Sequence, residues 1–143
     1  MIARLAREHN AWCQVDGAFG LWAAASPTLR GLVEGVAEAD SWATDAYKWL
    51  NVPYDCGGAI VRDRTAHAAA MNSFAGAEYI PQPQHDERQP AEWVPEFSRR
   101  ARGFAVYAAL RELGHSGVAA LVERCSAGAR SASLATARMS PTR

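Results

Sequence analysis

Lysine is nearly absent from this chain of 143 residues: fourteen of its fifteen basic residues are arginine, and Lys48 is the single lysine. Arginine cannot replace lysine where a nucleophilic amine is needed, because a guanidinium stays protonated whereas a desolvated ammonium can lose its proton. Schiff-base chemistry is one such use of lysine. Lys48 is therefore a candidate functional residue. On the count alone, a surface cation in a sequence biased toward arginine is the simpler interpretation.

Cysteine is also scarce. Cys13, Cys56 and Cys125 are odd in number and widely spaced, which is the pattern of neither a disulfide framework nor a zinc site. The four histidines likewise lack the spacing of metal ligands, so we expect no metal. Cysteine usage of this kind is typical of a reducing compartment, and we expect a cytoplasmic location.

An excess of charge and a long apolar run are both missing. The formal net charge is zero, so nothing in the composition favours nucleic acid. No apolar run approaches the length that spans a bilayer, and residues 1–8 are too charged for a secretion signal. With 49% hydrophobic residues, the chain is expected to fold as one domain with a core, without a nucleic-acid or membrane partner.

Apolar periodicity predicts alternating short strands and helices. The expected strands cover residues 11–16, 41–44 and 57–62. The expected helices are one ending after residues 2–6 and others at 28–39, 65–71, around 106–113 with a stop at Gly114, and 118–125. This order predicts an α/β fold with a largely parallel sheet. Because such strands need cover on both faces, a three-stranded sheet indicates part of a larger fold.

Two segments differ in amino-acid composition from the rest of the chain. Residues 74–98 are rich in proline, glutamine and charge, and a long loop of this kind inside a domain is usually functional or disordered. Residues 126–143 consist largely of Ser, Ala, Arg and Thr without sustained apolar period, and we expect a frayed or disordered tail there. The expected division is therefore a domain over 1–125 and a tail over 126–143.

The chemistry concentrates at the ends of the first two expected strands. Asp16 follows the first, and Lys48 lies just after the second. Open α/β sheets bind ligands at the carboxyl ends of their strands. An amine and a carboxylate placed there suit pyridoxal phosphate, whose aldehyde condenses with lysine and whose pyridine nitrogen pairs with an acid.

The residues around these two positions resemble a known family. Val15-Asp16-Gly17-Ala18-Phe19-Gly20 and the segment Asp40–Gly57, with Asp-Ser, Asp45, Tyr47-Lys48-Trp49-Leu50 and Pro-Tyr-Asp-Cys-Gly, are similar to the group II pyridoxal-phosphate-dependent amino-acid decarboxylases. The similarity extends through residues 93–102 to about Cys125. It implies the large domain of the aspartate-aminotransferase-like fold (fold type I), covering the middle third or so of a family member.

The resemblance implies roles by position. Lys48 matches the lysine that forms a Schiff base with the cofactor, and Asp16 matches the aspartate that holds the pyridinium. Ala18 matches the small residue against one face of the cofactor ring. Asp45 and Tyr47 occupy positions near the cofactor phosphate in relatives. Taken without the family, Asp16 could be a turn residue and Asp45 a cap at a strand end.

The family also has a tyrosine in a mobile loop after the lysine, which protonates the substrate carbon after carbon dioxide leaves. Tyr79 lies at a similar place, although a plain loop aromatic is the alternative. Two positions depart from the family: Tyr47 stands where the usual histidine precedes the lysine, and Gln14 replaces a second histidine. A tyrosine hydroxyl can still donate to a phosphate.

The implied function is decarboxylation of an L-amino acid to its amine by a full-length form with pyridoxal 5'-phosphate, acting as a homodimer. The family's N-terminal segment and C-terminal small domain are expected to lie outside these 143 residues, so we expect a truncated or frameshifted gene product, or a fragment of a longer protein. A non-catalytic remnant of such an enzyme is the first alternative. An aminotransferase or carbon–sulfur lyase that uses the same cofactor is the second.

Overall fold

The computed structural model describes residues 2–72, 90–96 and 98–139. The chain forms two compact units. One contains residues 1–59 together with 102–143, and it carries most of the sheet and the candidate site. The other contains residues 60–101. Each unit is treated separately below.

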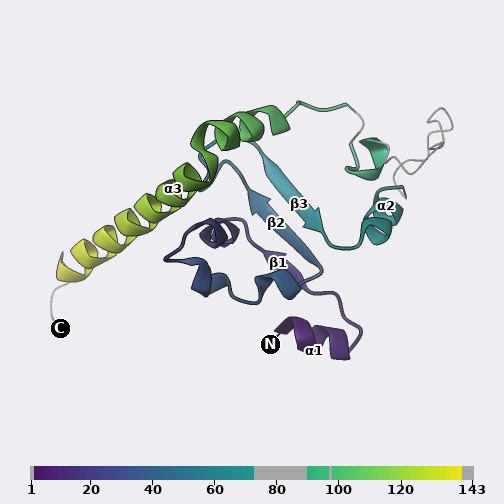
Figure 1. The fold of residues 1–143 in the computed structure, drawn as a ribbon, viewed down its shortest axis with the longest axis horizontal. Helices are drawn as coiled ribbons and strands as arrows, with labels where there is room; N and C mark the ends of the chain where they lie inside the picture. Colours follow the sequence, from purple (N-terminus) through teal and green to yellow (C-terminus); the bar gives the residue numbers. More distant parts are fainter. Residues whose placement is uncertain (1, 73–89, 97, 140–143) are drawn as a thin grey trace. The chain divides into compact units, whose positions relative to one another are not determined.

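A three-stranded sheet organises the first unit, with the strand order β1-β2-β3. β1 (Gln14–Asp16) and β2 (Ser41–Asp45) are parallel, and Asp16 pairs with Ala43. β3 (Gly57–Val61) follows β2 after a short connection and runs in the opposite direction (Figure 1). The α/β class and the three strands are thus confirmed, and the parallel arrangement holds for the first pair of strands.

The segment that joins β1 to β2 differs from the prediction. We expected an amphipathic α-helix over 28–39, but the chain forms three short 3₁₀ helices, η1 (Gly20–Ala25), η2 (Arg30–Val33) and η3 (Val36–Glu38). Gly35 lies between the last two with φ of 78°, a left-handed conformation that ends any regular right-handed helix. The prediction was therefore wrong, because it relied on the apolar spacing and did not take the conformation of Gly35 into account.

The C-terminal part is helical over most of its length. α3 spans Gly103–Met139 and is interrupted at Gly114, whose φ of 59° and ψ of −174° are not helical. Figure 1 shows the ribbon changing direction along this helix. The predicted stop at Gly114 is confirmed. The expected loss of regular structure after Ser126 is wrong at the level of secondary structure, since helix continues to Met139. The domain division at residue 125 stays a prediction.

A small apolar core lies under the end of β2. Its buried residues are Ala46, Leu50, Val52, Cys56 and Val118. The first four come from the connection between β2 and β3, and the last comes from α3. Partly buried apolar side chains surround them, including Trp22, Ala25, Tyr47, Val106 and Leu113. The core thus supports the segment that carries the lysine.

A buried polar contact fixes α3 to the start of the 3₁₀ segment. The fully buried Ser26 hydroxyl donates to Glu123 Oε1 at 2.6 Å, and the Thr28 hydroxyl donates to the same oxygen at 3.0 Å. Ser26 Oγ also accepts from the amides of Thr28 and Leu29, both at 3.2 Å. The hydrogen bond from Ser26 is the main reason that the pKa of Glu123 lies below its usual value.

The second unit contains α2 (Arg64–Asn72) and the 3₁₀ helix η4 (Pro90–Glu92). Asp63 caps α2, because its Oδ1 accepts from the amides at 65 and 66 at 2.8 and 3.0 Å. The ring of His67 lies edge-on to that of Trp93, with centroids 6.1 Å apart.

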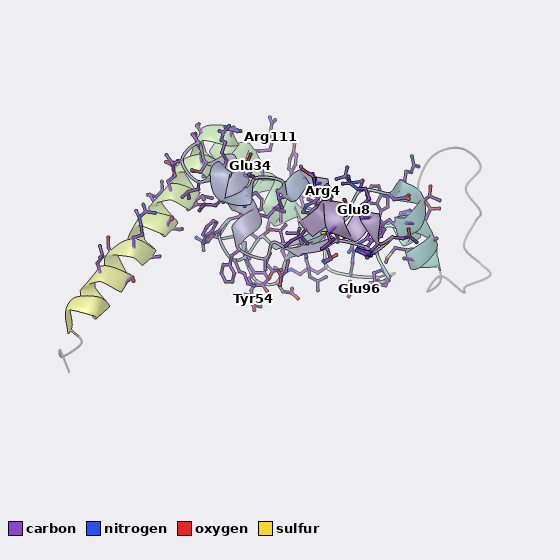
Figure 2. The ribbon with its side chains drawn as sticks, turned by 90° about the horizontal axis from the view of Figure 1, so that it is seen from below. Arg4, Glu8, Glu34, Tyr54, Glu96 and Arg111 are labelled. Carbon is purple, nitrogen blue, oxygen red and sulfur yellow. The ribbon has the colours of Figure 1, made fainter. Side chains whose placement is uncertain are left out.

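α1 (Ile2–Glu8) confirms the predicted N-terminal helix, and it carries an ion pair between Arg4 and Glu8 one turn apart, at 3.7 Å (Figure 2). Within the described ranges, we find no helix with the length and apolar character needed to cross a membrane.

Candidate functional site

The residues that follow β1 stay side by side with the last residues of β2. The amide of Gly17 donates to the carbonyl of Ala43 at 2.9 Å, and the amide of Asp45 donates to the carbonyl of Ala18 at 3.2 Å. A Cβ at position 17 would lie 2.9 Å from that Ala43 oxygen, so glycine permits the close approach. The two segments picked out by the sequence therefore meet at one edge of the sheet.

Lys48 is held at this edge by an ion pair. Its Nζ lies 2.7 Å from Asp45 Oδ2, and the two side chains are 25% and 24% exposed. A turn after β2 brings them together, because the amide of Lys48 also donates to the carbonyl of Asp45 at 3.3 Å. The hydrogen bond from Lys48 holds the pKa of Asp45 below its ordinary value, so Asp45 is ionised at neutral pH. The sequence placed both residues at the site but did not reveal this pairing.

Phe19 is a neighbour of Lys48 that the sequence analysis missed. The Lys48 Nζ lies 4.3 Å from the centroid of the Phe19 ring, which is within the range of a cation–π interaction. The sequence does contain a signal for this role, because Phe19 directly follows Ala18 in a segment assigned to the site.

Tyr47 joins the same cluster from the other side. Its hydroxyl donates to Asp45 Oδ2 at 3.2 Å, and its ring lies 4.1 Å from that of Tyr54. A hydrogen bond with Tyr54, then burial, then the hydrogen bond to Asp45 raise the pKa of Tyr47 to about 12. Tyr47 is therefore neutral throughout the physiological pH range. Tyr54 itself is largely exposed at the outer edge of this segment (Figure 2).

Asp16 and Ala18 occupy the β1 side of the site. The Asp16 side chain is exposed, and its Oδ1 accepts a hydrogen bond from the amide of Ala18 at 3.1 Å. Ala18 is half-buried. This local contact orients the carboxylate at the strand end, next to the backbone that pairs with Asp45. The Asp16 carboxylate remains available to a further partner.

The connection between β2 and β3 is closed by its own backbone. The amide of Ala46 donates to the carbonyl of Cys56 at 2.8 Å, and the amide of Asn51 donates to the carbonyl of Lys48 at 3.1 Å. Gly57 lies against Asp45, since a Cβ there would come within 3.3 Å of Asp45 Oδ1. These contacts fix the turn that carries the lysine.

The structure thus brings together five of the six predicted site residues at one sheet edge: Asp16, Ala18, Asp45, Tyr47 and Lys48. Tyr79 lies outside the described residues, so its role stays a prediction. In the part of the chain that the structure describes, no group of three or more His, Cys, Asp or Glu side chains could hold a metal ion.

This donor set fits pyridoxal phosphate. The group needs an amine to bind its aldehyde and an acid to pair with its ring nitrogen. The partly exposed Lys48 and the exposed Asp16 supply these two groups, at the ends of neighbouring parallel strands. An ionised carboxylate only accepts hydrogen bonds, so within the pair Asp45 and Tyr47 only the hydroxyl could donate to a phosphate, and it would have to give up its hydrogen bond to Asp45 to do so.

Comparison with known sequences supports this assignment. Residues 1–138 match the pyridoxal-dependent decarboxylase conserved domain. Tyrosine/DOPA decarboxylase 2 of Papaver somniferum is 32% identical over 116 residues, which are 79% of this chain and 22% of that protein. L-tyrosine/L-DOPA decarboxylase 2 of Lophophora williamsii is 26% identical over 117 residues, with 80% and 22% coverage.

Solved structures agree in fold. The structure of Oryza sativa TDC with PLP and tryptamine has a TM-score of 0.72 and 25% identity, covering 82% of this chain and 24% of that one. Mouse CSAD has a TM-score of 0.69 at 23% identity over 90% of this chain and 26% of its own, which shows a common fold. The chain spans about a fifth of the length of the curated relatives that it matches.

Proposed function

Because the chain belongs to the pyridoxal-dependent decarboxylase family, we propose that Lys48 and its neighbours are the lysine-bearing part of a pyridoxal 5'-phosphate site. In a full-length form, this site removes the carboxylate of an L-amino acid and leaves the amine. The observation that carries the proposal is the single lysine of the chain, held at the strand edge that also presents Asp16 and Ala18.

Each described residue has a distinct task in this proposal. Lys48 provides the amine that holds the cofactor and yields to the substrate amine. The Asp16 carboxylate would keep a proton on the ring nitrogen, and Ala18 would lie against one face of the ring. When bound, the pyridoxal group accepts the electron pair released as carbon dioxide departs. Tyr47 would donate to the phosphate in place of its hydrogen bond to Asp45. Tyr79, which lies outside the described residues, would return a proton to the substrate carbon.

We further propose a cytoplasmic location and a homodimer for the full-length form, with an amino acid as its substrate and with neither nucleic acid nor membrane as a partner. The absence of a disulfide pattern in the sequence supports the first of these. The names of the matched relatives point to tyrosine, DOPA and similar amino acids as the first substrates to try.

A second candidate is a non-catalytic remnant. An aminotransferase or carbon–sulfur lyase activity would use the same lysine and cofactor, and it differs in product. Incubation with a panel of amino acids distinguishes these outcomes: an amine with carbon dioxide indicates decarboxylation, a keto acid indicates amino transfer, and no product indicates the remnant.

The deciding experiment tests Lys48 directly. Purified chain is mixed with pyridoxal phosphate at increasing concentration, reduced with borohydride and mapped by mass spectrometry. We expect a saturable adduct on Lys48 in the folded chain, and a much weaker one in urea, where the site is lost. Lys48→Arg should abolish the adduct while it keeps the charge. Equal modification of Lys48 in folded and unfolded chain would contradict a built site.

A further inference from the structure

We infer that Phe19 is a positioning residue for Lys48: the face of its ring, together with the carboxylate of Asp45, holds the lysine side chain at the strand edge. The interaction itself is a property of the cofactor-free chain. Its consequence for catalysis rests on the function proposed above.

The backbone fixes Phe19 at this place. The carbonyl of the preceding residue, Ala18, accepts a hydrogen bond from the amide of Asp45 at 3.2 Å. This bond ties the residues after β1 to the start of the turn that carries Lys48. Phe19 then precedes η1, which begins at Gly20. The ring is 54% exposed, so solvent reaches it and the fold does not depend on its burial. The exposed ring is therefore open to contact with the Lys48 amine beside it.

Three side chains lie close to the Lys48 amine: Asp45, Phe19 and Tyr47. Asp45 Oδ2 lies 2.7 Å from Nζ, and the Phe19 centroid lies 4.3 Å away. The ring of Tyr47 is more distant, at 5.8 Å. An aromatic face attracts a cation and gives no such attraction to a neutral amine. Phe19 therefore adds to the effect of Asp45 instead of merely covering the side chain.

The catalytic consequence follows from what an amine must do. Lysine attacks a carbonyl only after its ammonium has lost a proton. The contacts with the ring and with Asp45 keep Nζ over the strand edge, and the side chain must leave both before Nζ can attack. Phe19 thus protects the single lysine from stray electrophiles and keeps it pointed at the place where a cofactor would bind.

The test measures the reactivity of Lys48 in the absence of pyridoxal phosphate. The folded chain is treated at one neutral pH with an amine-acylating ester, and the initial rate at Lys48 is followed by peptide mass spectrometry. A peptide with one lysine in the same tube provides the reference rate. We expect Phe19→Leu to raise the rate about two- to fivefold, the fold-change that a cation–π interaction at an exposed site represents. Phe19→Trp should leave the rate at or below that of the wild type.

Matched variants separate the explanations. Phe104→Leu makes the same change at a residue that is 79% exposed on α3, and it should leave Lys48 reactivity unchanged. Equal rates in wild type and Phe19→Leu would overturn the inference, and so would a Trp variant as fast as the Leu variant, since the ring would then act by bulk alone. If the Leu variant fails to fold, the Trp variant decides: a rate above wild type refutes the role of the ring.

This readout is independent of the proposed function. A faster Leu variant together with no pyridoxal adduct on Lys48 supports the role of Phe19 and contradicts the cofactor site. An adduct on Lys48 together with unchanged acylation rates supports the cofactor site and contradicts the role of Phe19.

Discussion

The two strand ends that form the candidate site are built very differently. At the end of β2, Lys48 is partly buried, pairs with Asp45 at 2.7 Å and rests on a turn packed over Leu50. At the end of β1, the Asp16 side chain is exposed, and among the described residues its carboxylate accepts one hydrogen bond, from the amide of Ala18. The amine is thus held by contacts within this segment and by the ring of Phe19, which follows β1. The backbone of Asp16 is fixed by strand pairing, whereas its side chain is exposed to solvent.

The difference indicates how the two groups depend on what binds them. A side chain held by an ion pair, a ring and a packed turn keeps its place without a ligand. An exposed carboxylate with one local hydrogen bond gains its remaining partners when a ligand arrives. We therefore expect changes beneath Lys48 to act through folding, and changes at Asp16 to act through binding. The following predictions test that contrast.

The largest effect is expected beneath the lysine. Leu50 is 3% exposed in the small core under the turn, so Leu50→Ala should lower the free energy of unfolding by about 2–5 kcal/mol, through lost burial and the cavity left behind. Urea unfolding followed by circular dichroism measures this. Because the turn loosens, the acylation rate of Lys48 in the folded fraction should rise as well.

Two controls sharpen this prediction. Leu50→Met keeps most of the volume and should cost less than about 1.5 kcal/mol. Leu32→Ala makes the same truncation at a side chain that is 81% exposed and should change stability by less than about 0.5 kcal/mol. If Leu50→Ala and Leu32→Ala had the same effect, the turn would not depend on its core, and the contrast between the strand ends would lose its basis.

An intermediate effect is expected where α3 meets the 3₁₀ segment. The pKa of Glu123 is lowered in the folded chain from its ordinary value of 4.5, chiefly by the hydrogen bond from Ser26. A carboxyl with a lowered pKa contributes stability above its unfolded pKa, and this contribution is lost as the pH falls through the folded pKa. The wild type should therefore lose stability below about pH 4.5 more steeply than Glu123→Gln, as measured by unfolding midpoints across the acid range.

Ser26→Ala provides the matched background for this measurement. It removes the main donor to Glu123, so in this background Glu123→Gln should flatten the acid limb much less. An equal change in both backgrounds would mean that the acid dependence arises elsewhere.

The sequence predicted those parts of the fold that depend on local pattern. The strands at 41–45 and 57–61, the helix at 64–72 and the break at Gly114 all follow from apolar runs and glycine. The prediction of a helix over 28–39 was wrong: the apolar spacing is that of a helix, but the backbone at Gly35 is left-handed. Residues 126–139 were misjudged in the opposite way, since alanine favours helix even where no apolar stripe shows.

The site was predictable to a different degree. A motif can tell which residues belong together, and Asp16, Ala18, Asp45, Tyr47 and Lys48 do meet at one edge. It cannot tell which partner each side chain chooses, because this depends on the turn after β2. The ion pair of Asp45 with Lys48 and the contact with Phe19 arise from that turn, and neither was visible in residue spacing alone.

The smallest effect on the free chain is expected at Asp16. Asp16→Asn keeps the size of the side chain and an oxygen that can accept from the amide of Ala18, and the position is exposed. It should change stability by less than about 0.5 kcal/mol and leave the acylation rate of Lys48 as in the wild type. Asp45→Asn, the same change at the other strand end, should raise that rate because it removes the charge that pairs with Nζ.

When pyridoxal phosphate is added, Asp16→Asn should have a clear effect, in contrast to its small effect on the free chain. An amide cannot keep a proton on the ring nitrogen as a carboxylate does, so the Asp16→Asn chain should need more cofactor to give the same adduct on Lys48. A change in the acylation rate of the cofactor-free Asp16→Asn chain would show that Asp16 already acts on Lys48, and the two strand ends would then be one coupled unit instead of a fixed amine and an open acid.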